Sequence, residues 1–158
     1  MSNGKLFNSV TELLSHTGEM VLLDTIENWG EDYLVSRVDL TQDHWFVDND
    51  GNTPSWVGLE YMAQSIGALA GIKSLMDKEP VRIGLLLGTR KFIAHEPYFP
   101  KQSPVTIRVD QIFLGEDHLA MFDCKIYSAE NKVLAEAQVK AIQPKNIEDI
   151  IPATPIGT

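Results

Sequence analysis

Cysteine is almost absent from this chain, and the absence limits what the protein can be. Cys124 is the single cysteine among 158 residues, so an internal disulfide and a multi-cysteine metal site are both excluded. Residues 1–15 are polar and mixed, without the continuous apolar segment of a signal peptide. The longest apolar run, residues 56–72, is interrupted by polar residues and is too short for a membrane span. These absences predict a soluble, cytoplasmic protein with no membrane partner.

Positive charge is also scarce. The chain has 13 Lys and Arg against 22 Asp and Glu, a formal net charge of −9, and no basic run. Such a chain is a poor partner for nucleic acid, because binding to phosphates depends on Lys and Arg. The densest basic cluster is Arg90 and Lys91, with Arg82 before it and Lys101 after it. This cluster either receives a small acidic partner or consists of solvated charges at a strand edge.

Several motifs that carry chemistry are missing as well. The sequence has no glycine-rich phosphate loop, no Ser-His-Asp arrangement and no spacing typical of metal ligands. We therefore expect no cofactor and no metal. Cys124 lies in an alternating apolar segment, which favours a buried, inert thiol over a nucleophile.

The patterns that are present predict one α+β domain spanning 1–158, with a core over roughly 10–143 and a loose tail at 144–158. Ser9 and Glu12 form a capping-box pattern for a short helix within 7–15. Alternating apolar and polar residues predict antiparallel strands, and turn residues predict a loop over 41–55. The predicted strands are 20–29, 32–40, 81–95, 103–114, 118–128 and 132–144.

One long helix is predicted over 56–76, and it is apolar on every side. Such a helix is expected to be buried all round, within a curled antiparallel sheet and against a second subunit. The glycines Gly58, Gly67 and Gly71 cost helix propensity, and we expect them to allow close approach of other backbone. Glu60 breaks the apolar pattern, and Gln64 shares its helix face.

Three segments resemble a known family. "HTGEMVLLDTI" (16–26), "GLEYMAQS" (58–65) and "LLLGTRKFIAHEPYFP" (85–100) are similar to hot-dog fold 3-hydroxyacyl-carrier-protein dehydratases. The combination of "PSWVGLEYMAQ" and "GLLLGTRKF" resembles the dehydratase-like proteins of aryl-polyene pigment clusters. The likeness spans roughly residues 10–143.

The resemblance implies a hot-dog fold and a carboxylate that faces a thioester in a tunnel at a dimer interface. Carried over, that acid is Glu60, and Gln64 matches the family's glutamine one turn later. A structural acid near the helix start is the alternative for Glu60. The family's Gly-His-Phe-Pro motif is absent from "HWFVDNDGNTPSWVG", so its catalytic histidine cannot be transferred by motif.

Two histidines are candidates for the missing base. His16 precedes a predicted strand that packs on the helix and is slightly favoured, because a base must be held firmly. His44 lies in the loop before the helix, whose turn residues predict mobility. Trp45 and Phe46 beside it are expected to lower its pKa and keep it neutral. The alternative for His16 is a turn residue that hydrogen-bonds the backbone, and the alternative for His44 is an exposed loop residue.

The other candidates concern substrate binding. Backbone N–H groups at Trp56, Val57 and Gly58 would hold the thioester oxygen as it gains charge. His95, at the end of a strand that lines the family's tunnel, either contacts substrate or is an ordinary strand-end residue. His118 follows a turn and is expected at the surface.

Three functions stay open. The first is a lyase that dehydrates a 3-hydroxyacyl thioester on an acyl carrier protein, in fatty acid or polyene biosynthesis. The second is an acyl thioesterase on the same fold, in which the helix carboxylate activates water. The third is a non-catalytic subunit that pairs with an active dehydratase. The sequence does not distinguish a homodimer from a heterodimer, and it does not give the acyl chain.

Overall fold

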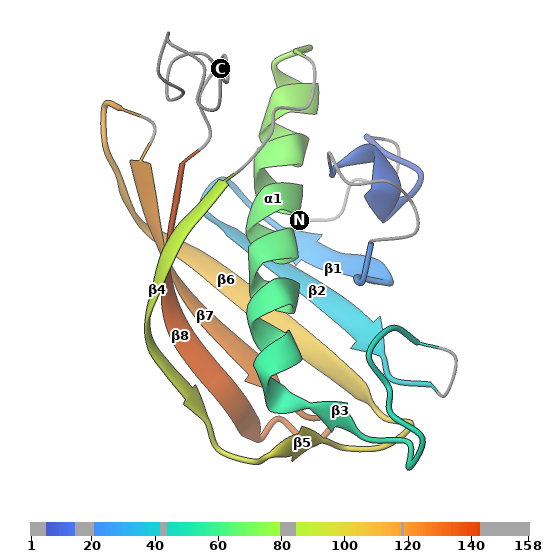
Figure 1. Cartoon of the computed structure of the whole chain (residues 1–158). Helices are drawn as coiled ribbons and strands as arrows, with labels where there is room; N and C mark the ends of the chain where they lie inside the picture. The colour runs from blue at the N-terminus through green and yellow to red at the C-terminus, as the bar shows by residue number, and fades with distance from the viewer. Residues whose placement is uncertain (1–5, 15–20, 42–43, 80–84, 118, 143–158) are drawn as a thin grey trace, which may run out of the picture.

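The computed structural model describes residues 6–14, 21–41, 44–79, 85–117 and 119–142. Within them one six-stranded antiparallel sheet curls around one long α-helix (Figure 1). The helix α1 spans Gly58–Met76 and follows a 3₁₀ turn at Ser55–Val57. The strand order is β1-β2-β6-β7-β8-β4. The strands are β1 Thr25–Trp29, β2 Tyr33–Asp39, β4 Leu85–Ala94, β6 Pro104–Leu114, β7 Leu119–Tyr127 and β8 Val133–Ile142.

The alternating pattern of the strands produces a sheet with one buried face. Leu34, Ser36 and Val38 of β2 are buried, whereas the residues between them are partly exposed. β6, β7 and β8 show the same period of two over much of their length, because successive side chains of a strand point to opposite faces. The α+β fold predicted from the sequence is confirmed: the chain has the hot-dog architecture.

The helix is buried on the side that faces the sheet, but not all round. Tyr61, Met62, Leu69 and Ile72 are at most 1% exposed. A stripe on another side stays partly exposed and consists of Leu59, Glu60, Ala63, Gly67, Ala70 and Lys73. The sheet therefore encloses only part of the helix, and the expectation that a second subunit covers the rest stays a prediction. No helix in the described part of the chain is long and apolar enough to cross a membrane.

Two elements differ from expectation. The predicted loop over 41–55 contains β3 (Thr53–Pro54), which pairs with β5 (Tyr98–Phe99); the pair lies at the end where α1 begins (Figure 1). Two residues per strand are too few for a periodic signal in the sequence. The predicted N-terminal helix is a 3₁₀ turn at Val10–Glu12, and the Glu12 carboxylate accepts the N–H of Ser9 at 2.9 Å.

The helix glycines permit close contacts, as the sequence predicts. A Cβ on Gly71 would collide with the backbone carbonyl of Leu13 and lie 2.8 Å from its carbon. A Cβ on Gly58 would lie 2.8 Å from the Cδ1 of Ile126 and 3.0 Å from the Cζ of Phe99. The nearest neighbour of Gly71 is the N-terminal segment rather than the sheet.

This contact predicts that Gly71→Ala destabilises the protein. The added methyl group forces backbone apart, which costs about 2 kcal/mol and exceeds the roughly 1 kcal/mol that alanine gains in helix propensity. The free energy of unfolding, measured in denaturant, should therefore fall. Gly88→Ala is the control: nothing lies within 4 Å of its Cβ position, and a change below about 0.5 kcal/mol is expected. Equal effects of the two substitutions would contradict the close contact.

Candidate active site

Gln64 joins the central helix to the segment that leads into β1. Its side-chain oxygen accepts the backbone N–H of Leu22 at 2.8 Å, and its nitrogen donates to the Glu60 carboxylate at 3.2 Å. Gln64 is only 1% exposed, whereas Glu60 is partly exposed. The helix thus buries its amide and leaves its carboxylate within reach of solvent or a ligand.

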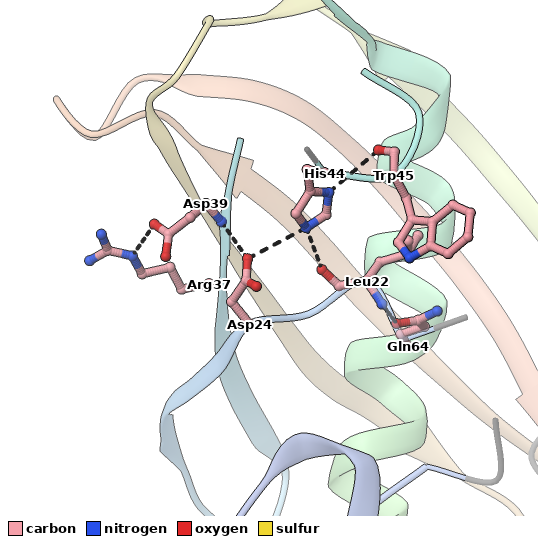
Figure 2. A network of polar contacts seen from close by, with 7 residues as sticks. All are labelled: Leu22, Asp24, Arg37, Asp39, His44, Trp45 and Gln64. Carbon is pink, nitrogen blue, oxygen red and sulfur yellow. Dashed lines mark hydrogen bonds and ion pairs between the residues drawn. The ribbon is translucent and has the colours of Figure 1, made fainter. Parts of the chain in front are cut away.

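His44 contacts Leu22, the residue whose N–H bonds to Gln64, at its carbonyl oxygen. Its Nε2 lies 3.1 Å from the Leu22 carbonyl oxygen and 3.5 Å from Asp24, and its Nδ1 lies 3.4 Å from the Trp45 carbonyl oxygen (Figure 2). The side chain is 10% exposed. These contacts fix the position of the His44 ring in the structure, and the mobility expected from the turn residues of this loop stays a prediction.

Glu60 and His44 therefore belong to one chain of contacts. It runs from Glu60 to Gln64, through the backbone of Leu22, and on to His44 and Asp24. The structure thus links the predicted acid with one of the two predicted bases. His16 and His118 lie outside the described residues.

The pKa of His44 is raised above its ordinary value of 6.5. Its contact with the Asp24 carboxylate is the largest cause, and it outweighs the opposing effect of burial. The sequence predicts the reverse, because Trp45 and Phe46 are expected to form an apolar wall. That expectation is wrong: Trp45 and Phe46 are 47% and 44% exposed, and the Asp24 carboxylate decides the direction of the pKa shift.

Asp24 is the site residue that sequence reasoning misses. Burial, the largest single influence, would raise its pKa, yet the contacts with His44 and with the backbone N–H of Asp39 together lower it below 3.8. The Asp39 N–H donates to Asp24 at 2.7 Å (Figure 2). The one signal in the sequence is an acid directly after the apolar run "MVLL", which does not reveal the distant histidine.

Tyr61 follows Glu60 on the helix and is fully buried. Its ring stacks on Phe99 at 5.9 Å. Its hydroxyl has no hydrogen-bond partner among the described residues. Burial, and next the charge of Asp24, raise its pKa, so the hydroxyl stays protonated and is available as a donor.

The helix start only partly matches its expected role. The Gly58 N–H donates to the Ser55 carbonyl oxygen within the 3₁₀ turn, so this amide is engaged and the expectation that it holds a substrate oxygen is not supported by the geometry. Val57 is buried, whereas Trp56 is 61% exposed and meets Phe46 edge-on at 5.9 Å. The amides of Trp56 and Val57 remain candidates, because the first N–H groups of a helical segment lack acceptors within it.

The remaining candidates lie apart from this network. His95 follows β4, and its Nε2 contacts Glu136 at 2.7 Å with the side chain 40% exposed. Cys124 is 1% exposed and burial raises its pKa, which confirms a buried thiol. The described ranges hold no group of three or more His, Cys, Asp and Glu residues placed to bind a metal.

Comparison with known proteins links this arrangement to a family. Residues 8–152 match the sequence model of the ApeP-like family, described as ApeP dehydratase. The search of curated proteins found no significant match.

Solved structures give the same indication. The dehydratase heterocomplex ApeI:P from Xenorhabdus doucetiae contains a similar chain, with 28% identity, a TM-score of 0.83, and coverage of 91% of this chain and 96% of that one. A hypothetical thioesterase with coenzyme A from Streptococcus pneumoniae TIGR4 is 15% identical, with a TM-score of 0.60 and coverage of 75% and 84%. The E. coli PaaI protein is 12% identical, with a TM-score of 0.58 and coverage of 74% and 80%. The last two show a shared fold.

The His44–Asp24 contact predicts a pH-dependent stability. A raised histidine pKa stabilises the folded state fully below 6.5, and this stabilisation is lost as pH rises through the folded pKa. On the acid side it is lost as pH falls through the folded pKa of Asp24, below 3.8. The advantage of the wild type over His44→Gln in free energy of unfolding should therefore be largest between these limits. Denaturant titrations from about pH 2 to pH 9 test both limits, and a constant difference would contradict the pairing.

Proposed function

Because the chain belongs to the ApeP-like dehydratase family, we propose that it removes water from a 3-hydroxyacyl thioester carried by an acyl carrier protein during polyene synthesis. It would do so as a single hot-dog domain without a cofactor. The observation that carries the proposal is the chain of contacts that links Glu60 on the helix to His44 in the preceding loop. A carboxyl group and an imidazole are the acid and base that this elimination needs.

The proposed reaction assigns one proton transfer to each group. Neutral His44 takes the proton from the α carbon, and the electrons of that C–H bond form the double bond to the β carbon. The C–O bond at the β carbon breaks, and Glu60 in its protonated form gives its proton to the leaving hydroxyl. The products are an enoyl thioester and water, and proton exchange then returns both groups to their starting states.

The thioester oxygen gains negative charge as the α carbon loses its proton. The amides of Trp56 and Val57, at the start of the helical segment, are the proposed donors to that oxygen. The helix dipole adds positive potential at the same place.

We propose that the working form is a dimer, with a second, related hot-dog subunit as the partner and a homodimer as the alternative. The half-exposed helix stripe around Ala63 and Gly67 and the edge strand β4 are unoccupied by the described part of this chain. The similar chain from Xenorhabdus doucetiae comes from a dehydratase heterocomplex, which supports a heterodimer here.

Two alternatives lead to different assays. In a thioesterase, Glu60 would activate water and the thioester would be hydrolysed; the fold shared with the Streptococcus pneumoniae hypothetical thioesterase keeps this candidate open. In a non-catalytic subunit, this chain would only complete the site of its partner. A thioesterase would release a free acid as its product. If this chain is a non-catalytic subunit, no substitution in its own contact network should alter the proton transfers.

The proposal predicts that Glu60→Gln removes activity and leaves the fold intact. The amide keeps the shape of the carboxyl group but cannot donate the acidic proton, so turnover of a 3-hydroxyacyl carrier-protein thioester should fall by about 10²-fold or more. Mass spectrometry of the acyl group, with and without the partner subunit, measures the loss of water. Glu116→Gln, in the exposed turn after β6, is the matched control. Activity close to wild type in Glu60→Gln would make Glu60 a structural acid.

The two candidate bases are separated by their own variants. We propose His44, because its ring is held next to Leu22 and Asp24; His16 is the alternative. His44→Ala should reduce dehydration by about 10²-fold or more, whereas His16→Ala should keep most of it. The reverse result would assign the base to His16, and full activity in both variants would exclude each of them.

A further inference from the structure

Oxygen atoms surround the His44 ring, and all of its described contacts are with acceptors. Nε2 lies near the Leu22 carbonyl and the Asp24 carboxylate, and Nδ1 lies near the Trp45 carbonyl. These oxygens can only accept, and Nε2 faces two of them, one at the shorter distance of 3.1 Å, so Nε2 carries the single proton of the neutral ring. Nδ1 then holds the lone pair, 3.4 Å from the Trp45 carbonyl oxygen, which accepts a hydrogen bond once Nδ1 is protonated.

Resting on the proposed dehydratase function, we propose that Asp24 is the positioning residue of the base: its carboxylate stabilises the imidazolium that forms when Nδ1 of His44 takes the substrate proton. The Leu22 carbonyl, at the shorter distance of 3.1 Å, fixes which nitrogen carries the first proton. Asp24, at 3.5 Å, supplies the opposite charge. Asp24 itself touches no substrate in this scheme.

The backbone of β2 holds Asp24 in place. The N–H of Asp39 donates to the same Oδ2 oxygen that faces His44. A backbone donor fixes the carboxylate more firmly than a flexible side chain does, because it belongs to a strand paired on both sides. The carboxylate is 39% exposed, so solvent weakens the interaction but does not remove it.

The other charged groups near the pair come from three elements. On β2, Arg37 donates to the Asp39 carboxylate at 2.9 Å, and on β1 Glu27 lies 3.9 Å from Arg37. On α1, Glu60 reaches the pair only through neutral Gln64 and Leu22, and the protonated Tyr61 senses the charge of Asp24. Arg37 is therefore compensated within its own strand, and Asp24 is the carboxylate in contact with the imidazole.

Stabilisation of the imidazolium by Asp24 changes the pH dependence of turnover, whereas a purely structural role of Asp24 would not. A base must be neutral to act, so the acid limb of kcat reports the pKa of His44 in the complex with substrate. Without the Asp24 charge this pKa falls, and the limb moves to lower pH. The weaker base also transfers protons more slowly, so the high-pH plateau drops. The two profiles therefore converge as pH decreases.

The test uses Asp24→Asn in the full chain, together with the partner subunit if activity requires it. Above the acid limb, kcat should fall by about tenfold or more, with little change in KM. NMR titration of the His44 ring, assigned among four histidines with His44→Gln, should show a lower pKa than in the wild type. Asp24→Glu, which keeps the charge, should recover part of both quantities.

Glu27→Gln is the matched control, because it removes one carboxylate from the same surface without touching His44; neither quantity should move. An unchanged His44 titration in Asp24→Asn, or a profile lowered at every pH with its limb in place, would overturn the inference. If Asp24→Asn does not fold, Asp24→Glu must still shift the His44 titration, since the charge has moved. If the wild type shows no dehydration with or without a partner, the proposed function fails, and the NMR titration still decides whether Asp24 controls His44.

Discussion

The buried hydrogen bond between the Leu22 N–H and Gln64 is the contact on which the candidate site depends. Gln64 is 1% exposed, so water cannot replace a lost partner, and leaving either group unpaired would cost about 1–3 kcal/mol. The bond holds Leu22 against the helix, and the carbonyl of the same residue receives His44. One residue without a reactive side chain thereby fixes the distance between an acid on the helix and an imidazole in a loop.

Much of the fold follows from patterns within single segments. The period-two alternation predicts the strands of the large sheet, and the apolar run with its three glycines predicts a central helix approached closely by other chain segments. The β3–β5 pair escapes prediction because it is only two residues long on each side. The helix, apolar on every side, predicts that a second subunit shares in covering it, whereas the residues of the partly exposed stripe are known only from the way the sheet wraps around the helix.

The site is predictable only where its residues share an element. Glu60 and Gln64 are one turn apart, so helical geometry alone brings them together. His44 and Asp24 lie in separate loops and are brought together only by the tertiary structure. The apolar neighbours of His44 in the sequence predict a lowered pKa, whereas its pKa is raised. Local sequence records which groups are close along the chain, whereas the charge of an imidazole depends on groups that are close in space. The resemblance to dehydratases points to Glu60 as a candidate acid but gives no sign of Asp24, the carboxylate that contacts His44.

The two edges of the described sheet are both irregular. β1 shifts register between Ile26 and Asn28, and β4 shifts twice, with Lys91 in a left-handed conformation at φ 57°. A straight, unpaired edge is a template on which any extended chain can polymerise. The irregular edges, one of which carries a lysine, interrupt that template. The same feature makes the folded sheet selective, since a strand that joins either edge must match its irregular register.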